Sequence, residues 1–243
     1  MIQAYLSEIK ELFENLETVE KNSLQKAAHK TAEAIVNGGI VHIFGCGHSH
    51  IIGEEVFYRA GGLAPVHPIL IEEVMLHKGA VQSSMFERSA DFACTFLDDQ
   101  DIRPNDILIV VSTSGRNPVP IDVALHGKQQ GAYVVGITSL SYPKKQSSRH
   151  KSGKFLYDAV DLVINNHTKP GDGVISIDGT GISYGPSSSV IGLTIINSII
   201  VGVIERLIEL DIEPPVFKSG NIDGSDEHNR KLIEAYKDRI PFF

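Results

Sequence analysis

The stretch Ile107-Leu108-Ile109-Val110-Val111-Ser112-Thr113-Ser114-Gly115-Arg116-Asn117 joins five apolar residues directly to a loop rich in hydroxyl groups. A short apolar run of this kind predicts a buried strand. Pro118 follows at once and suits the first turn of a helix. Three hydroxyls and a glycine at the start of a helix can donate several hydrogen bonds to an anion, so the stretch predicts a phosphate-binding turn. A serine-rich turn that only caps the helix is the alternative.

A second loop, Gly45-Cys46-Gly47-His48-Ser49, follows the apolar run at residues 40–44. Its glycines allow a sharp turn close to a ligand. A dinucleotide-binding fingerprint needs a third glycine at position 50, where this chain has His50. Cys46, His48 and His50 carry groups that bind zinc, but their spacing matches none of the usual zinc motifs. We therefore expect a phosphorylated small molecule at these loops, with no metal and no cofactor.

Apolar runs typical of strands alternate with helical patterns along the middle of the chain, which indicates parallel strands joined by helical crossovers. The sequence predicts an α/β fold with a doubly wound five-stranded parallel sheet flanked by helices. The expected strands are residues 40–44, 66–71, 107–111, 133–138 and 159–164, and the expected helices are residues 49–61, 82–97, 119–130, 188–210 and 226–238. In such sheets ligands bind beyond the carboxyl ends of the strands, where both loops lie.

The N-terminal residues repeat apolar side chains at helical spacing until Gly38-Gly39, either as one long helix or as two joined near Asn22-Ser23. Such a segment packs on its own domain or reaches a second subunit, and both interpretations stay open. Residues 141–154 and 169–187 are expected to be loops. Because no linker divides the chain, we expect a single domain over residues 1–243, with a helical segment at 1–37, a core at 38–210 and a helical tail at 211–243.

Composition limits the classes of partner. The chain has 243 residues, 42% of them hydrophobic, and a net charge of −8, which opposes general nucleic-acid binding. Its two cysteines supply no disulfide framework. Its first residues do not form a signal peptide, and the apolar stretch at 190–204 is too short to span a membrane. We expect a cytoplasmic protein that binds neither nucleic acid nor membrane.

Four segments together resemble the sugar isomerase (SIS) domain over residues 30–210: the two loops above, Val135-Gly136-Ile137-Thr138-Ser139, and Gly185-Pro186-Ser187-Ser188-Ser189. The resemblance implies a flavodoxin-like arrangement of the sheet, a homodimer or homotetramer with sites near subunit interfaces, and a phosphorylated sugar as ligand. It also implies the residues that contact this ligand: Gly47, His48, Ser49, Ser112, Thr113, Ser114, Asn117, Thr138 and Ser139.

Within that family the chain looks most like the phosphoheptose isomerases, which implies aldose-ketose isomerisation by an acid and a base. The family's catalytic glutamate matches Arg59 here, and its late helix lacks the expected histidine. Residues that can replace them are Glu55, His77, Glu205 and His228. Two other functions stay open: a non-catalytic phosphosugar sensor or regulatory protein, and an amino-sugar-phosphate lyase or etherase.

Overall fold

The computed structural model describes residues 1–243 and contains a five-stranded parallel sheet. The strands are β1 (Val41–Gly45), β2 (Val66–Ile69), β3 (Ile107–Val111), β4 (Tyr133–Thr138) and β5 (Leu162–Asn165). Their spatial order is β2-β1-β3-β4-β5, with every neighbouring pair parallel. This is the flavodoxin-like order, in which the chain reverses its direction of winding between β1 and β3. The predicted fold class is confirmed.

Side chains that alternate between the two faces of the sheet divide the hydrophobic core into two layers, one on each face. Ile107, Ile109 and Val111 face one side of the sheet, whereas Leu108 and Val110 face the other. Successive strand residues point to opposite faces, so a strand with apolar residues at every position must be covered on both sides. The five residues of β3 are all buried, as this pattern requires.

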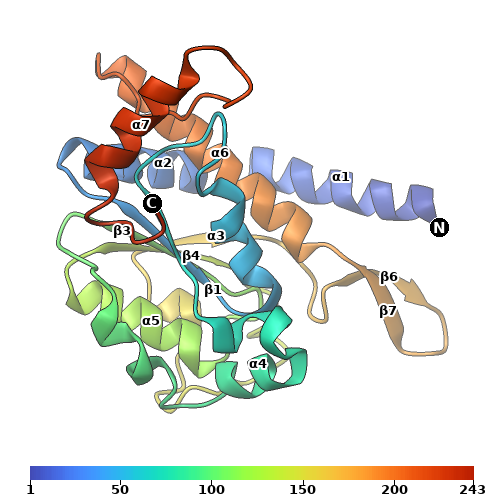
Figure 1. Ribbon diagram of the computed structural model, residues 1–243. Coiled ribbons are helices and arrows are strands. Elements are labelled where there is room, and N and C mark those ends of the chain that lie inside the picture. Colours follow the sequence, from blue (N-terminus) through green and yellow to red (C-terminus); the bar gives the residue numbers. More distant parts are fainter.

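Helices cover both faces of the sheet (Figure 1). One layer holds α2 (Lys21–Val36), α3 (Ile51–Val56) and α6 (Ser188–Glu209), and α1 (Ile2–Thr18) packs against α6. The opposite layer holds α4 (Ala80–Glu87) and α5 (Pro118–Gln129). The N-terminal segment is therefore two helices, and they separate at Val19 and Glu20 rather than at Asn22.

The helix α6 is the one helix long and apolar enough to cross a membrane by length and composition, with a mean hydropathy of 1.9 in its most apolar window. It packs instead against α2, and Ile195, Ile199 and Val203 have no exposed surface. Gly192 allows this helix to approach α3 closely, because a Cβ there would lie 2.5 Å from Cδ1 of Ile52. The apolar composition of α6 thus reflects its place in the core.

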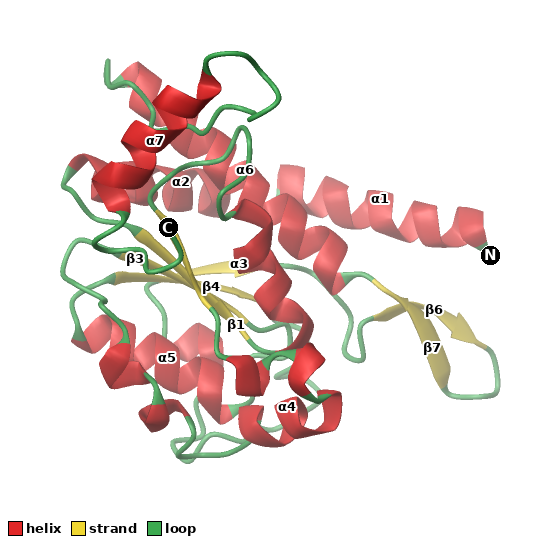
Figure 2. Cartoon of the chain, in the orientation of Figure 1, coloured by secondary structure: helices red, strands yellow, loops and turns green.

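The segment expected to be a loop at residues 169–187 contains an antiparallel hairpin, β6 (Gly173–Ile177) and β7 (Ile182–Pro186). Its turn uses Gly179 and Gly181 at positive φ, so the glycines that indicate a loop in fact make a tight turn. The hairpin projects beside the N-terminal end of α1 (Figure 2). Tyr5 holds its base by donating a hydrogen bond from Oη to the carbonyl oxygen of Pro186 over 2.8 Å.

Two helices are shorter than their predicted ranges. The helix expected at residues 82–97 ends at Glu87, and the chain continues in 3-10 turns. Phe92, which precedes these turns, packs against Phe86 of α4 and against Phe96. The helix expected at residues 49–61 ends at Val56, because Phe57 is extended and Tyr58 has a φ of 44°. Residues 141–154 form turns without a helix or strand, as predicted.

The C-terminal helix α7 (Ser225–Tyr236) and the residues after it lie at the amino ends of the strands. Arg239 donates a hydrogen bond to Asp106, which immediately precedes β3. Phe242 and Phe243 add to an aromatic cluster with Phe57. The carboxyl ends of the strands, where the two predicted loops emerge, lie at the opposite edge of the sheet.

Candidate functional site

The two hydroxyl-bearing loops emerge side by side. The first leaves β1 at Gly45 and the second leaves β3 at Val111, and these two residues are paired in register. The winding of the sheet reverses between β1 and β3, so the helices that follow them diverge and leave a crevice at this point. The position favours a ligand site between the loops.

The first loop turns sharply because two of its residues have no side chain. A Cβ on Gly45 would lie 2.5 Å from the backbone of Ser49, and Gly47 has a φ of 57°. The turn leaves His48 exposed and buries Cys46. His50 turns back onto the carbonyl oxygen of Gly47. Cys46, His48 and His50 thus point in different directions and do not form a metal-binding cluster.

The second loop is held by hydrogen bonds from both sides. Gly115, at a φ of 57°, donates its N–H to Oγ of Ser112 over 3.3 Å. The carbonyl oxygen of Thr113 accepts from the backbone of Ser139 over 3.0 Å and from Oγ1 of Thr138 over 3.4 Å. Ser112, Thr138 and Ser139 are buried and support the loop from behind.

A small pocket, with a cavity volume of about 10 Å³, opens between the loops and the start of α6. Its apolar floor includes Val111 and Ile137, the ends of two central strands. Its polar lining consists of His48, Ser49, Thr113, Asn166, Ser188 and Ser189. The hydroxyl groups of Ser49 and Ser189 donate no hydrogen bond within the protein, so they can donate to a ligand.

Three of the predicted ligand contacts, His48, Ser49 and Thr113, line this pocket. Ser112, Thr138 and Ser139 lie behind them, and Gly47 shapes the first loop. Ser114 is partly exposed on the second loop and makes no side-chain hydrogen bond. Asn117 precedes α5, and its side chain is already bonded: it donates to Glu87 and accepts from Arg149, both over 2.9 Å.

Two residues of this region were not predicted from the sequence: Asn166, and Asp172, whose carboxylate caps the start of α6. Asn166 is 1% exposed and donates from Nδ2 to Oγ1 of Thr113 over 3.3 Å. Its place directly after β5 was the available signal, because polar residues that end a parallel strand face the ligand edge. Asp172 accepts from the backbone N–H groups of Ser187 and Ser188. These two hydrogen bonds satisfy backbone N–H groups that have no partner within the helix, at the end of α6 beside the pocket.

None of the four predicted catalytic residues lines the pocket. Glu55 bonds Arg59 and also accepts from Nδ2 of Asn197 on α6 over 3.3 Å. His77 is exposed on a 3-10 turn. Glu205 is exposed on α6, 13 residues beyond Gly192 and so about 20 Å further along the helix. His228 bonds the carbonyl oxygen of Val216 over 2.9 Å on α7. Their catalytic roles stay predictions.

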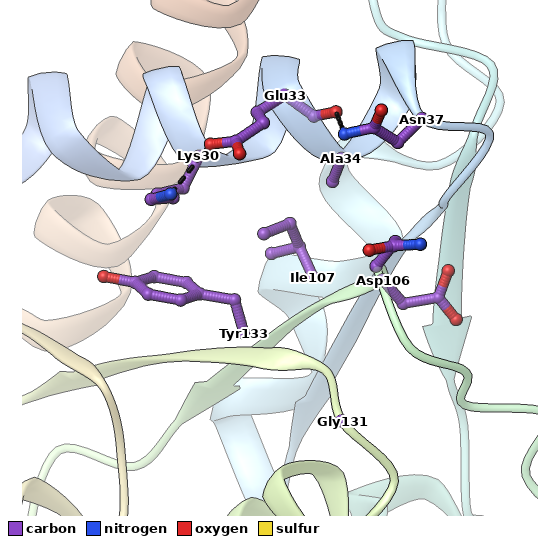
Figure 3. Close-up of a pocket in the computed structure, with 9 residues that line it drawn as sticks. Lys30, Glu33, Ala34, Asn37, Asp106, Ile107, Gly131 and Tyr133 are labelled. Atoms are coloured by element: carbon purple, nitrogen blue, oxygen red, sulfur yellow. Dashed lines mark hydrogen bonds and ion pairs between the residues drawn. The ribbon is translucent and has the colours of Figure 1, made fainter.

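Another pocket lies at the amino ends of the strands, between α2 and the starts of β3 and β4 (Figure 3). Lys30 and Glu33 form an ion pair of 2.7 Å above Tyr133. Both side chains of this pair are more than 40% exposed, so the pocket offers a solvated ion pair rather than a preorganised group. It lies at the edge away from the two loops, and we assign it no part in their chemistry.

Comparisons with known proteins agree with this geometry. The SIS domain family matches residues 4–139. The chain is 57% identical to UPF0309 protein BH0227 of Halalkalibacterium halodurans, over 99% of this chain and 96% of that protein. It is 55% identical to a UPF0309 protein of Geobacillus thermodenitrificans, over 99% of this chain and 97% of that protein.

Two solved structures have the same fold. Phosphoheptose isomerase GmhA from Neisseria gonorrhoeae aligns with a TM-score of 0.54 at 14% identity, over 84% of this chain and 97% of that chain. The NanR protein of Vibrio vulnificus, complexed with ManNAc-6P, aligns with a TM-score of 0.50 at 15% identity, over 100% of this chain and 68% of that one. At such identities the likeness establishes the fold alone. With the matching family pattern over more than half of its length, the chain belongs to the SIS domain family.

Proposed function

We propose that this protein binds a phosphorylated sugar between its two loops and interconverts the aldose and ketose forms. The observation that carries the proposal is the meeting of two hydroxyl-bearing loops at the point where the sheet reverses its winding. A phosphate has several acceptor oxygens, and free hydroxyls together with the N-terminal end of α5 offer donors for them. The solved isomerases of this fold provide further support.

We assign the ligand contacts by their positions. Ser49, Thr113 and Ser114 donate to the phosphate or the sugar, and His48 faces the open side of the pocket. Gly47 and Ser112 shape the loops, whereas Thr138 and Ser139 hold the second loop in place. Asn117 contributes through its position at the start of α5, since its side chain bonds Glu87 and Arg149.

The protein acts, in this proposal, as a cytoplasmic homodimer or homotetramer without a cofactor. The outer face of α6 supports an oligomer, because Val201 is 65% exposed and Ile208 is 62% exposed on an otherwise apolar helix. Large apolar groups exposed together mark surfaces that bind other proteins. The same helix lines the pocket at its N-terminal end, and Val201 lies about 18 Å further along the helix than Ser189.

A panel of aldose and ketose phosphates with three to seven carbons tests the proposal. We expect at least one of them to raise the melting temperature and to be isomerised, as followed by NMR. Ser114→Ala should weaken that ligand about 10- to 100-fold, because a hydrogen bond to a charged group contributes about 1.5–3 kcal/mol. Ser7→Ala, on the exposed side of α1, is the matched control. If no sugar phosphate binds, the proposal fails.

A second candidate function is a phosphosugar sensor without catalysis. It is favoured by the absence of the four predicted catalytic residues from the pocket lining, and by the ManNAc-6P complex of NanR, which has the same fold. Both functions predict stabilisation by a sugar phosphate. Only the isomerase also exchanges a carbon-bound proton of that ligand with solvent, so exchange in D₂O separates the two.

A further inference from the structure

Glu87, the last residue of α4, carries a carboxylate that lies beside both loops. Its Oε1 accepts a hydrogen bond from Nδ2 of Asn117, at the end of the second loop, over 2.9 Å. Its charge also helps to raise the pKa of the Cys46 thiol, in the first loop, although burial is the larger cause. Glu87 lies outside the lining of the small pocket at the start of α6. Its carboxylate lies beside the start of α5, at the end of the second loop, where the N-terminal end of that helix offers donors to a phosphate.

The carboxylate has no ion-pair partner, because no lysine, arginine or histidine nitrogen lies within the distance of a salt bridge. The guanidinium of Arg149 instead donates to Oδ1 of Asn117 over 2.9 Å, so the amide of Asn117 stands between Arg149 and Glu87. Burial raises the pKa of Glu87, while the Asn117 hydrogen bond and the charges of Arg88 and Arg149 act in the opposite direction. A carboxyl group with a raised pKa exchanges protons more readily near neutral pH.

The other carboxylates near the two loops already have partners within the protein. Glu55 bonds Arg59 and Asn197. Glu54 is exposed and lies 3.6 Å from His50. Asp172 accepts hydrogen bonds from the backbone of Ser187 and Ser188 at the start of α6. Glu87 differs from these because one of its oxygens is fixed by a neutral amide and Oε2 accepts no hydrogen bond.

We propose that Glu87 is the carboxyl group that transfers the proton between the two carbons of the phosphosugar, with Asn117 and Arg149 as its positioning residues. This inference rests on the proposed function and names the base that the family pattern leaves missing at Arg59. The carboxylate takes the proton from C2 of the aldose, and the electron pair of that C–H bond forms the enediolate. The carboxyl group then returns the proton to C1.

The charge on oxygen balances through a second proton. The C2 hydroxyl loses its proton and becomes the ketose carbonyl, while the former carbonyl oxygen at C1 gains one and becomes a hydroxyl. His48 is the imidazole that lines the pocket, and it can carry this proton between the two oxygens. No oxidant, reductant or co-reactant is required.

The experiment compares Glu87→Gln with two other carboxylate variants in the full-length protein. Glu87→Gln should lower the rate of isomerisation and of C2 deuterium exchange in D₂O by about 100-fold or more. It should keep the melting-temperature rise produced by the sugar phosphate, because the amide still bonds Asn117. Glu73→Gln, at an exposed position near α4, should behave as wild type. Glu55→Gln tests the competing assignment.

Asn117→Ala separates positioning from simple structural support. Because the Asn117 hydrogen bond lowers the pKa of Glu87, its loss should move the acidic limb of the kcat/KM profile to higher pH. An unshifted limb contradicts the positioning role. Wild-type exchange in Glu87→Gln overturns the inference, as does loss of exchange in Glu55→Gln alone. If the wild-type protein binds no sugar phosphate, the proposed function itself fails. If it binds a sugar phosphate but catalyses no deuterium exchange at C2, the protein is a sensor and the inference about Glu87 is wrong.

Discussion

Arg239 donates a hydrogen bond from Nη2 to Oδ2 of Asp106 over 2.8 Å, across 133 positions of sequence. The Asp106 side chain has no exposed surface, and that of Arg239 is 15% exposed. Asp106 also accepts from the backbone N–H groups of Ile40 and Arg103. One buried carboxylate therefore joins the start of the sheet to the C-terminal tail.

Removal of this guanidinium should destabilise the whole domain. Arg239→Met leaves the Asp106 charge buried without its cation, which typically costs about 3 kcal/mol of unfolding free energy. Urea denaturation measures the change. Arg230→Met, on the exposed side of α7, is the matched control and should change the free energy of unfolding by less than about 0.5 kcal/mol. Equal effects of the two variants would show that the tail is not anchored at Asp106.

Two buried histidines beside this carboxylate should make stability depend on pH. Nδ1 of His42 lies 3.0 Å from Nδ1 of His67, and Nε2 of His42 lies 3.1 Å from Asp106. Since the carboxylate only accepts, His42 donates to it from Nε2 and accepts from His67 at Nδ1. Burial, with the nearby His42 and Arg239, lowers the pKa of His67 to about 4 from its ordinary 6.5.

Between pH 6.5 and 4 the unfolded chain therefore binds a proton at His67 that the folded chain does not. The free energy of unfolding should fall by about 3 kcal/mol as the pH decreases through this window. His67→Gln keeps an N–H donor for His42 without titrating, so it should flatten that part of the profile. Burial raises the pKa of Asp106, but the hydrogen bonds from His42 and Arg239 outweigh burial and lower this pKa to about 2 from its ordinary 3.8. The stability that the ionised Asp106 contributes is therefore lost only below about pH 3.8. If the free energy of unfolding of wild type and of His67→Gln fell equally steeply between pH 6.5 and 4, His67 would not be the group that causes this pH dependence.

The sheet was predictable from sequence because its determinants are local. Ile107 to Val111 are apolar at every position, which only a strand covered on both faces accommodates, and the glycines after β1 and β3 specify sharp turns. Together these features predicted the parallel sheet and the edge at which its loops emerge.

The rest depends on contacts between distant residues. Glu87 lies within a predicted helical pattern, and nothing around it in sequence indicates Asn117, 30 positions away. The glycines of residues 169–187 indicate turns, but strand pairing between Ile175 and Tyr184 decides that the segment is a hairpin. Glu55 lies on the first turns after the loop, yet Asn197 and Arg59 hold its carboxylate. Periodicity predicts elements, whereas side-chain partners follow from packing.

The shape of the second loop should matter separately from its hydroxyls. A Cβ on Gly115 would lie 2.6 Å from Oγ1 of Thr138, and its φ of 57° strains any other residue. Gly115→Ala should therefore displace the loop and abolish stabilisation by sugar phosphates. Gly153→Ala carries similar backbone strain, at a φ of 72°, but its Cβ meets nothing within 4 Å. Gly153→Ala should lose about 1–2 kcal/mol of stability from backbone strain, and Gly115→Ala should lose more because of the contact with Thr138. Only Gly115→Ala should lose ligand binding in a thermal-shift assay.

The exposed apolar face of α6 should hold the subunits together. Val201 lies midway along this face, and a glutamate there would bury a charge without a partner in any interface that covers it. Val201→Glu should convert the oligomer into monomers in sedimentation-velocity experiments, while the unfolding transition of the monomer persists. Val36→Glu, a substitution of the same kind at a 47% exposed position at the end of α2, should keep the wild-type mass. A wild-type mass for Val201→Glu, or a monomeric wild type, would show that α6 is not the subunit interface. Loss of isomerisation on dissociation would further indicate that the partner subunit completes the pocket at the start of α6.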